Sequence, residues 1–156
     1  MTMAAPSDVI DEAPADAEQL RVFIVENHAD TREFLTVMLE ALGHVAISAD
    51  SMSKALRQIP ASNCDVLLSD IGLPDGDGWE LLGKLNLQRP IFAIAMSGFG
   101  MAGDRARSKA AGFRHHLVKP MGLEQLEAIL VEAARELRSG CAADAQRPFL
   151  ISANPG

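Results

Sequence analysis

The sequence has few aromatic residues, few cysteines and no long apolar run. Among its 156 residues 4% are aromatic, with one tryptophan and no tyrosine, so the hydrophobic core must be built mainly from aliphatic side chains. Two cysteines, Cys64 and Cys141, are too few for a disulfide framework or a cysteine-based metal site. No stretch approaches the ~18 apolar residues that a membrane-spanning helix needs.

Basic residues are outnumbered by acidic ones. The chain has 14 Lys and Arg against 21 Asp and Glu, a formal net charge of −7, which argues against non-specific binding of nucleic acid. Residues 1–20 contain no basic residue and no apolar run, which excludes a secretory signal peptide. We therefore expect a cytoplasmic protein that binds neither nucleic acid nor a membrane.

The composition divides the chain into three parts. Residues 1–20 combine five acidic residues with two prolines and many alanines, which predicts a disordered acidic N-terminal lead. Residues 141–156 contain Pro148, Pro155 and many small residues, which predicts a loose C-terminal tail. Residues 21–140 lie between these segments and are expected to form a single domain.

Short apolar runs alternate with amphipathic segments through this domain. The predicted strands are 22–25, 44–47, 65–69, 90–95 and 113–118, and the predicted helices are 29–42, 51–59, 79–87, 102–111 and 123–137. The glycine-rich segment 70–77 is predicted to be a loop. Five strand–helix units predict a doubly wound α/β fold, a five-stranded parallel sheet with helices on both faces.

Local signals refine the helix boundaries. Asp30 and Glu33 have the spacing of a capping box at the start of the first helix, and Phe34 falls on its apolar face with Leu35. Pro60 is expected to end the second helix.

Polar residues follow four of the five predicted strands. They are Glu26 and Asn27 after the first, Asp70 after the third, Ser97 after the fourth, and Lys119 with Pro120 after the fifth. Because such sheets bind ligands beyond the carboxyl ends of their strands, we expect these groups to converge. Carboxylate and amide oxygens suit Mg²⁺, an aspartate can accept a phosphoryl group as a nucleophile, and a lysine can neutralise a phosphoryl oxygen.

These segments resemble the receiver domain of bacterial two-component response regulators. The matching segments are 22–27, 30–32, 67–74, 77–78, 95–98 and 117–120, and the resemblance covers about residues 20–138. It implies a flavodoxin-like fold with strand order 2-1-3-4-5. Segments 97–100 and 115–120 resemble most the receivers attached to hybrid sensor kinases.

The resemblance implies a role for each strand-end residue. Asp70 would accept a phosphoryl group from a histidine kinase or a histidine phosphotransfer protein. The ligands of Mg²⁺ would be Glu26, Asn27, Asp70 and the main-chain carbonyl of Gly72. Ser97 and Lys119 would bind the phosphoryl group, and the bond between Lys119 and Pro120 is expected to be cis. Such a protein is a phospho-switch that catalyses only its own modification, rather than a turnover enzyme.

Three residues depart from the usual pattern of that family. Asn27 stands where a second acid is common, which predicts weaker Mg²⁺ binding. His116 stands where an aromatic switch residue is common, so the switch could be altered, pH-sensitive or absent. Gly76 replaces a large apolar residue and predicts a looser loop after Pro74.

Other functions stay open at this point. Asn27 and His116 leave room for a degenerate receiver that takes no phosphate and acts as a docking module. A Mg²⁺-dependent phosphohydrolase fits poorly, because such enzymes usually carry their nucleophile after the first strand. About 16 residues follow residue 140, too few to fold alone, so we expect output through contact with a downstream protein. A homodimer is also left open.

Overall fold

The computed structural model describes residues 19–98 and 102–143 of the chain. The predicted acidic lead lies outside these ranges except for residues 19–20, of which Leu20 is buried in the core. The predicted tail also lies outside them, except that residues 141–143 continue the last helix.

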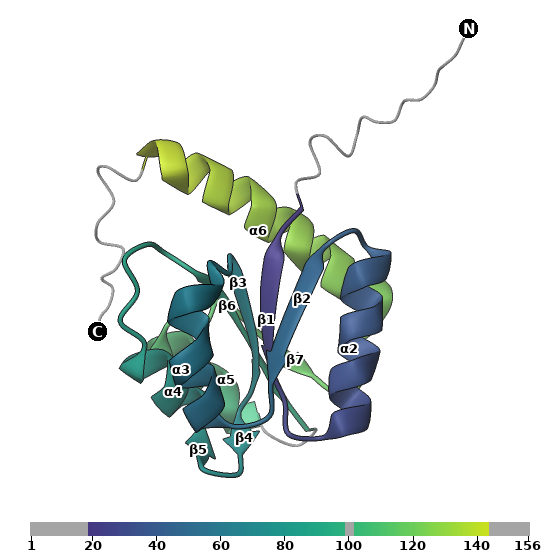
Figure 1. Ribbon diagram of the computed structural model, residues 1–156, viewed down its shortest axis with the longest axis vertical. Coiled ribbons are helices and arrows are strands. Elements are labelled where there is room, and N and C mark those ends of the chain that lie inside the picture. The colour runs from purple at the N-terminus through teal and green to yellow at the C-terminus, as the bar shows by residue number, and fades with distance from the viewer. Residues whose placement is uncertain (1–18, 99–101, 144–156) are drawn as a thin grey trace, which may run out of the picture.

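Five parallel strands form the central sheet. They are β1 (Arg21–Val25), β2 (Val45–Ala49), β3 (Val66–Asp70), β6 (Phe92–Ser97) and β7 (His115–Val118). They are arranged in the order β2-β1-β3-β6-β7, with every neighbouring pair parallel (Figure 1). Counted along the chain this is the order 2-1-3-4-5, so the predicted α/β fold class and topology are confirmed.

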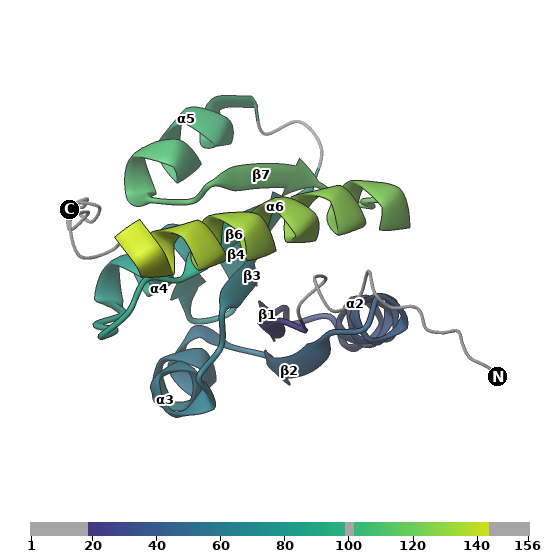
Figure 2. The ribbon, with the colours of Figure 1, turned by 90° about the horizontal axis from the view of Figure 1, so that it is seen from above.

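Helices cover both faces of the sheet. They are α2 (Ala29–Ala41), α3 (Met52–Ser62), α4 (Gly78–Lys84), α5 (Ala102–Ala111) and α6 (Leu123–Ala143). Seen from above, α2 and α6 lie on one side of the sheet, and α3 and α4 lie on the other (Figure 2). Helix α5 packs against α4 and the edge strand β7. In the described ranges, no helix is long and apolar enough to cross a membrane.

The alternation of side chains along β1 divides the core in two. Val22 and Ile24 pack in the cluster that includes Leu39 from α2, whereas Phe23 and Val25 pack in the cluster on the opposite face. Successive strand residues point to opposite faces, so a buried strand must be apolar at every position. This requirement explains the continuous apolar run that marks β1 in the sequence.

Helix α2 begins at Ala29 as predicted, but its first turn is not capped as predicted. The N-cap is His28, and its imidazole makes no capping bond because it is held on Glu26 instead. Asp30 and Glu33 therefore form no capping box. Phe34 does not pack in the core with Leu35, since its side chain is 54% exposed.

The largest differences from the predicted helix boundaries are at the ends of α3, α4 and α6. Helix α3 continues two residues past Pro60 and ends before Asn63, whose φ of 56° is left-handed. Pro60 removes one N–H donor and crowds the carbonyl four residues earlier, a cost that α3 accepts within its last turn. Helix α4 ends earlier than predicted, at Lys84, and α6 continues to Ala143.

The predicted loop 70–77 contains a small antiparallel pair, β4 (Gly72–Leu73) and β5 (Gly76–Asp77). Asp75, at its tip, accepts hydrogen bonds from the backbone N–H groups of Met52 and Ser53 at 2.7 and 2.9 Å. A Cβ at Gly76 would meet the end of the Met52 side chain at 2.6 Å. Asp75 therefore ties the hairpin to the start of α3, and Gly76 leaves room for the end of the Met52 side chain.

Candidate functional site

Two buried carboxylates share one lysine at the carboxyl edge of the sheet. Lys119 follows β7, and its Nζ lies 3.0 Å from Glu26 Oε1 and 3.0 Å from Asp70 Oδ2. Glu26 follows β1 and has no exposed surface, and Asp70, the last residue of β3, is 6% exposed. The fold thus brings Lys119 to two carboxylates that lie 93 and 49 residues before it in the chain.

The pKa values of the two carboxyl groups are shifted in opposite directions. Burial acts to raise the pKa of Glu26, but hydrogen bonds from His28 and Lys119 outweigh it and hold that pKa below its usual value. Burial raises the pKa of Asp70, and the neighbouring Glu26 adds to the effect against the opposing Lys119. Burial alone would lower the pKa of Lys119, yet its two carboxylate partners raise it. The lysine is therefore charged and Glu26 ionised at neutral pH.

The backbone around Asp70 is closely packed. A Cβ at Gly78 would lie 2.7 Å from the Asp70 carbonyl oxygen, so only glycine allows the start of α4 to approach the strand end. The Gly72 N–H lies 3.4 Å from Asp70 Oδ1. The position of the Asp70 carboxylate is thus set by the loop that follows it as well as by Lys119.

A residue that the sequence prediction missed also reaches the carboxylates. The ring Nδ1 and the backbone N–H of His28 both lie 3.0 Å from Glu26 Oε2. Glu26, His28 and Asp70 each offer one metal-ligand atom, and the three atoms lie within 4.8 Å of one another. Asn27 is exposed and does not cap α2. The sequence offered one signal for this contact: His28 follows Glu26 by two residues and directly precedes a predicted helix.

The donor set fits a hard divalent cation. Two buried carboxylates carry two negative charges, and Lys119 compensates one of them, so the site retains negative charge. Carboxylate oxygens are the ligands that Mg²⁺ prefers, supplemented by water. The site therefore keeps a net negative charge that a bound divalent cation would neutralise.

Ser97 and His116 lie next to this centre but bond to each other. Ser97 is the last residue of β6, and its Oγ is 2.7 Å from His116 Nε2. His116 in β7 is buried, and its Nδ1 is 2.8 Å from Ser108 Oγ in α5. His115 points to the opposite face, where its Nε2 lies 3.0 Å from Glu132 Oε1. The peptide bond between Lys119 and Pro120 is cis.

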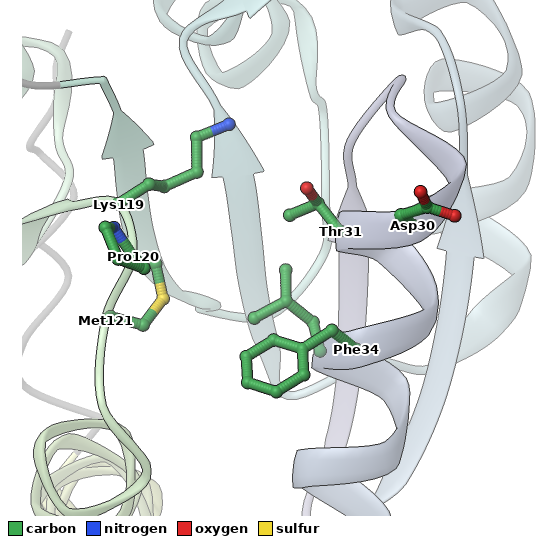
Figure 3. Close-up of a pocket in the computed structure, with 7 residues that line it drawn as sticks. Asp30, Thr31, Phe34, Lys119, Pro120 and Met121 are labelled. Carbon is green, nitrogen blue, oxygen red and sulfur yellow. The ribbon is translucent and has the colours of Figure 1, made fainter.

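An apolar pocket of about 250 Å³ opens beside the carboxylates, between α2 and the segment after β7 (Figure 3). Phe34 and Met121 face each other across it. The residues lining it are Asp30, Thr31, Phe34, Leu35, Lys119, Pro120 and Met121. The exposed side chain of Phe34 thus belongs to a hollow surface at the mouth of the site.

Comparison with known proteins places this geometry in a family. Residues 22–131 match the family described as response regulator receiver domain. The chain is 32% identical over 123 residues to the KDP operon transcriptional regulatory protein KdpE of Escherichia coli, covering 79% of this chain and 55% of that protein. It is 26% identical over 131 residues to the sensor histidine kinase RcsC of Escherichia coli, covering 82% of this chain and 14% of that kinase. This chain therefore spans little more than half of the first relative and a small part of the second.

Solved structures agree with the fold. A CheY-like receiver domain from Methanospirillum hungatei has a TM-score of 0.72 and 26% identity, with 78% of this chain and 98% of that one covered. The receiver domain of a sensor histidine kinase from Pseudomonas aeruginosa, which holds a magnesium ion in its active-site cleft, has a TM-score of 0.67 and 24% identity, with 76% of this chain and 99% of that one covered. Sequence, fold and strand-end geometry thus agree, and the chain belongs to the response regulator receiver domain family.

Proposed function

We propose that Asp70 accepts a phosphoryl group from a phosphohistidine of a histidine kinase or a histidine phosphotransfer protein. The observation that carries the proposal is the bridge from Lys119 to Asp70 and Glu26, with both carboxylates buried at the strand ends. In the reaction the phosphorus–nitrogen bond of the donor breaks and a phosphorus–oxygen bond to Asp70 forms. The donor imidazole leaves with the electron pair and takes up a proton.

The groups around Asp70 have separate tasks in this step. Lys119 already touches the nucleophilic carboxylate, so its ammonium is placed to pair with the phosphoryl oxygens as charge is transferred. Glu26 retains its negative charge through its hydrogen bonds from His28 and Lys119. The ligands of Mg²⁺ would be Glu26, Asn27, Asp70 and the Gly72 carbonyl, with His28 at the rim. When bound, the ion supplies positive charge that stabilises the transferring phosphoryl group.

The donor must bring its histidine to this edge of the sheet. The pocket beside Lys119 and the exposed side chains of Phe34 and Val37, 54% and 57% accessible, form an apolar surface next to Asp70. Such patches mark contact sites when they lie beside a functional centre. We place the docking of the donor protein on this surface.

Phosphorylation of the intact chain tests the proposal. Acetyl phosphate with Mg²⁺ should add the mass of one phosphoryl group to the wild-type chain and to Asp65→Asn, and none to Asp70→Asn. Asp65 directly precedes the opposite end of β3, where its carboxylate accepts from the Arg21 N–H, so it is a matched control. A wild-type chain that takes no phosphate from acetyl phosphate or from any kinase would instead identify a degenerate receiver that acts as a docking module.

Docking is tested by comparing small and protein donors. Phe34→Ala should slow phosphotransfer from a histidine kinase several-fold while leaving modification by acetyl phosphate unchanged, because the small donor needs no docking surface. Val131→Ala on α6 removes a similarly exposed apolar side chain, 50% accessible, at another place and should change neither rate. Equal slowing with both donors would show that Phe34 acts on the site itself.

A further inference from the structure

A chain of hydrogen bonds, buried except at its tryptophan end, runs from the end of β6 to helix α4. Trp79 Nε1 donates to Ser108 Oγ at 2.9 Å, Ser108 Oγ lies 2.8 Å from His116 Nδ1, and His116 Nε2 lies 2.7 Å from Ser97 Oγ. Ser108, His116 and Ser97 are 1%, 8% and 4% exposed. Three elements, α4, α5 and β7, thus connect the tryptophan to the hydroxyl group beside the phosphoacceptor edge.

The tryptophan fixes the direction of this chain. An indole N–H can only donate, so the Ser108 oxygen is an acceptor in that bond. In the described part of the molecule, the Ser108 hydroxyl has one other hydrogen-bond partner, His116 Nδ1. A buried hydroxyl whose proton has no acceptor costs free energy, so Ser108 donates to Nδ1.

A neutral imidazole then has only one arrangement. When Nδ1 accepts, the ring proton sits on Nε2, and that N–H donates to Ser97. Burial lowers the pKa of His116, and the nearby Arg105 acts in the same direction against the opposing Asp104, which favours the neutral ring. A charged ring would place N–H groups on both nitrogens and leave the Ser108 proton without its acceptor.

The Ser97 hydroxyl is consequently left with a proton to donate. Its oxygen accepts from His116, and no other hydrogen-bond partner of this hydroxyl occurs among residues 19–98 and 102–143. Asp70 pairs in register with Met96, so Ser97 stands one residue farther along, at the same edge of the sheet. The proton is therefore available to an acceptor arriving at Asp70.

We propose that Trp79, Ser108 and His116 are positioning residues, which hold the Ser97 hydroxyl as the donor to a phosphoryl oxygen on Asp70. This inference rests on the proposed phosphoacceptor role of Asp70. When a phosphoryl group binds, Ser97 donates its proton to it at one end of this hydrogen-bond chain. The environment of Trp79 in α4, at the other end, changes as a result. The Arg107 guanidinium lies 3.9 Å from the centre of the Trp79 ring, which places this response next to the surface of α5.

The tautomer of His116 is the first test. Nitrogen NMR of the full chain labelled at histidine should show Nε2–H and unprotonated Nδ1 for His116 at pH 7. Trp79→Phe removes the donor that directs Ser108, so the preference should weaken to a mixture of tautomers. Ser108→Ala should do the same and Ser108→Thr should restore it, because threonine keeps the hydroxyl. An Nδ1–H tautomer or a charged ring in the wild-type chain refutes the inference.

Binding of beryllofluoride with Mg²⁺, as a phosphoryl substitute, is the second test. Trp79→Phe and Ser108→Ala should weaken it about three- to tenfold, the worth of one well-oriented hydrogen bond. Arg107→Met is the matched control, because it removes the contact with the Trp79 ring but leaves the hydrogen-bond chain intact. Unchanged affinity in Trp79→Phe refutes the positioning role. Failure of the wild-type chain to bind refutes the proposed function itself, whatever tautomer His116 has.

The tryptophan also supplies a readout at the far end of the chain of bonds. Trp79 is the only tryptophan in the sequence, so its fluorescence and indole N–H resonance are unambiguous. Both should change when beryllofluoride binds the wild-type chain. The indole resonance should not respond in Ser108→Ala, in which the connection is cut. A response of equal size in that variant would show that another route reaches α4 and would refute the connection.

Discussion

Replacing Lys119 with methionine should destabilise the protein far more at pH 8 than at pH 4. Methionine keeps an unbranched apolar stem but lacks the ammonium group that lies 3.0 Å from both Glu26 and Asp70. The two carboxylates, both buried, then face each other without a compensating charge. Removal of one partner from a buried ionic group typically costs about 3–5 kcal/mol, because the remaining charge is left unpaired.

The structure allows the pH-dependent part to be estimated. The ligand oxygens of Glu26 and Asp70 lie within 4.8 Å of each other, and at an effective dielectric constant of about 20 two unit charges at that distance repel by about 3.5 kcal/mol. This repulsion is fully present at pH 8. At pH 4 one of the two carboxyl groups can hold a proton, and the repulsion is relieved. We therefore expect a loss of about 3 kcal/mol at pH 8 and about 1 kcal/mol or less at pH 4.

Urea unfolding of the wild-type protein and of Lys119→Met at pH 8 and pH 4 measures this difference. The control is Lys54→Met, which removes an exposed ion pair with Asp50 whose partners are 49% and 43% accessible. Because both partners are exposed to water, this substitution should change the free energy of unfolding far less than Lys119→Met does at pH 8. If Lys119→Met loses the same free energy at pH 4 and pH 8, the loss comes from packing and the electrostatic reasoning is refuted.

Four further substitutions test the carboxylate pair, the metal site, the hairpin contact of Asp75 and the burial of His44. Because the pKa of Asp70 is raised and that of Glu26 lowered, Asp70→Asn should raise the free energy of unfolding at pH 7 and Glu26→Gln should lower it, as measured by urea titration. Both differences should shrink toward pH 3, and equal signs at pH 7 would contradict the assignment. Asn27→Asp should tighten Mg²⁺ binding measured by calorimetry, since it adds a charge beside the carboxylates; unchanged affinity would exclude that position from the metal site. Asp75→Ala should lower the free energy of unfolding by leaving two N–H groups at the start of α3 without their acceptor, whereas Asp75→Asn keeps one acceptor oxygen and should lower it less. Burial lowers the pKa of His44 below its ordinary 6.5, so its contribution to stability is present above pH 6.5 and is lost as the pH falls. His44→Asn should therefore reduce the slope of stability against pH between 7 and 5.5, and an unchanged slope would count against this reading.

The sequence by itself determined the sheet and the edge at which the site lies. Strands buried on both faces are largely apolar, so a charged residue marks where each of them ends. Glu26, Asp70 and Lys119 each lie at the end of such a strand, and parallel strands bring their carboxyl ends to one edge. Burial pattern and topology were therefore enough to predict which distant residues meet.

Only the tertiary structure decided how the side chains around that edge are bonded. Trp79 and Ser108 lie on different helices, 29 residues apart, and no local pattern indicates that they touch. The same is true of Asp75, which holds the start of α3 across 23 residues. His28 was missed as a partner of Glu26. Whether its ring caps α2 or bonds Glu26 depends on the path of the backbone between β1 and α2, which the sequence does not show. Periodicity reports which face of an element is buried, whereas a hydrogen bond between two elements depends on their packing, which the periodicity does not encode.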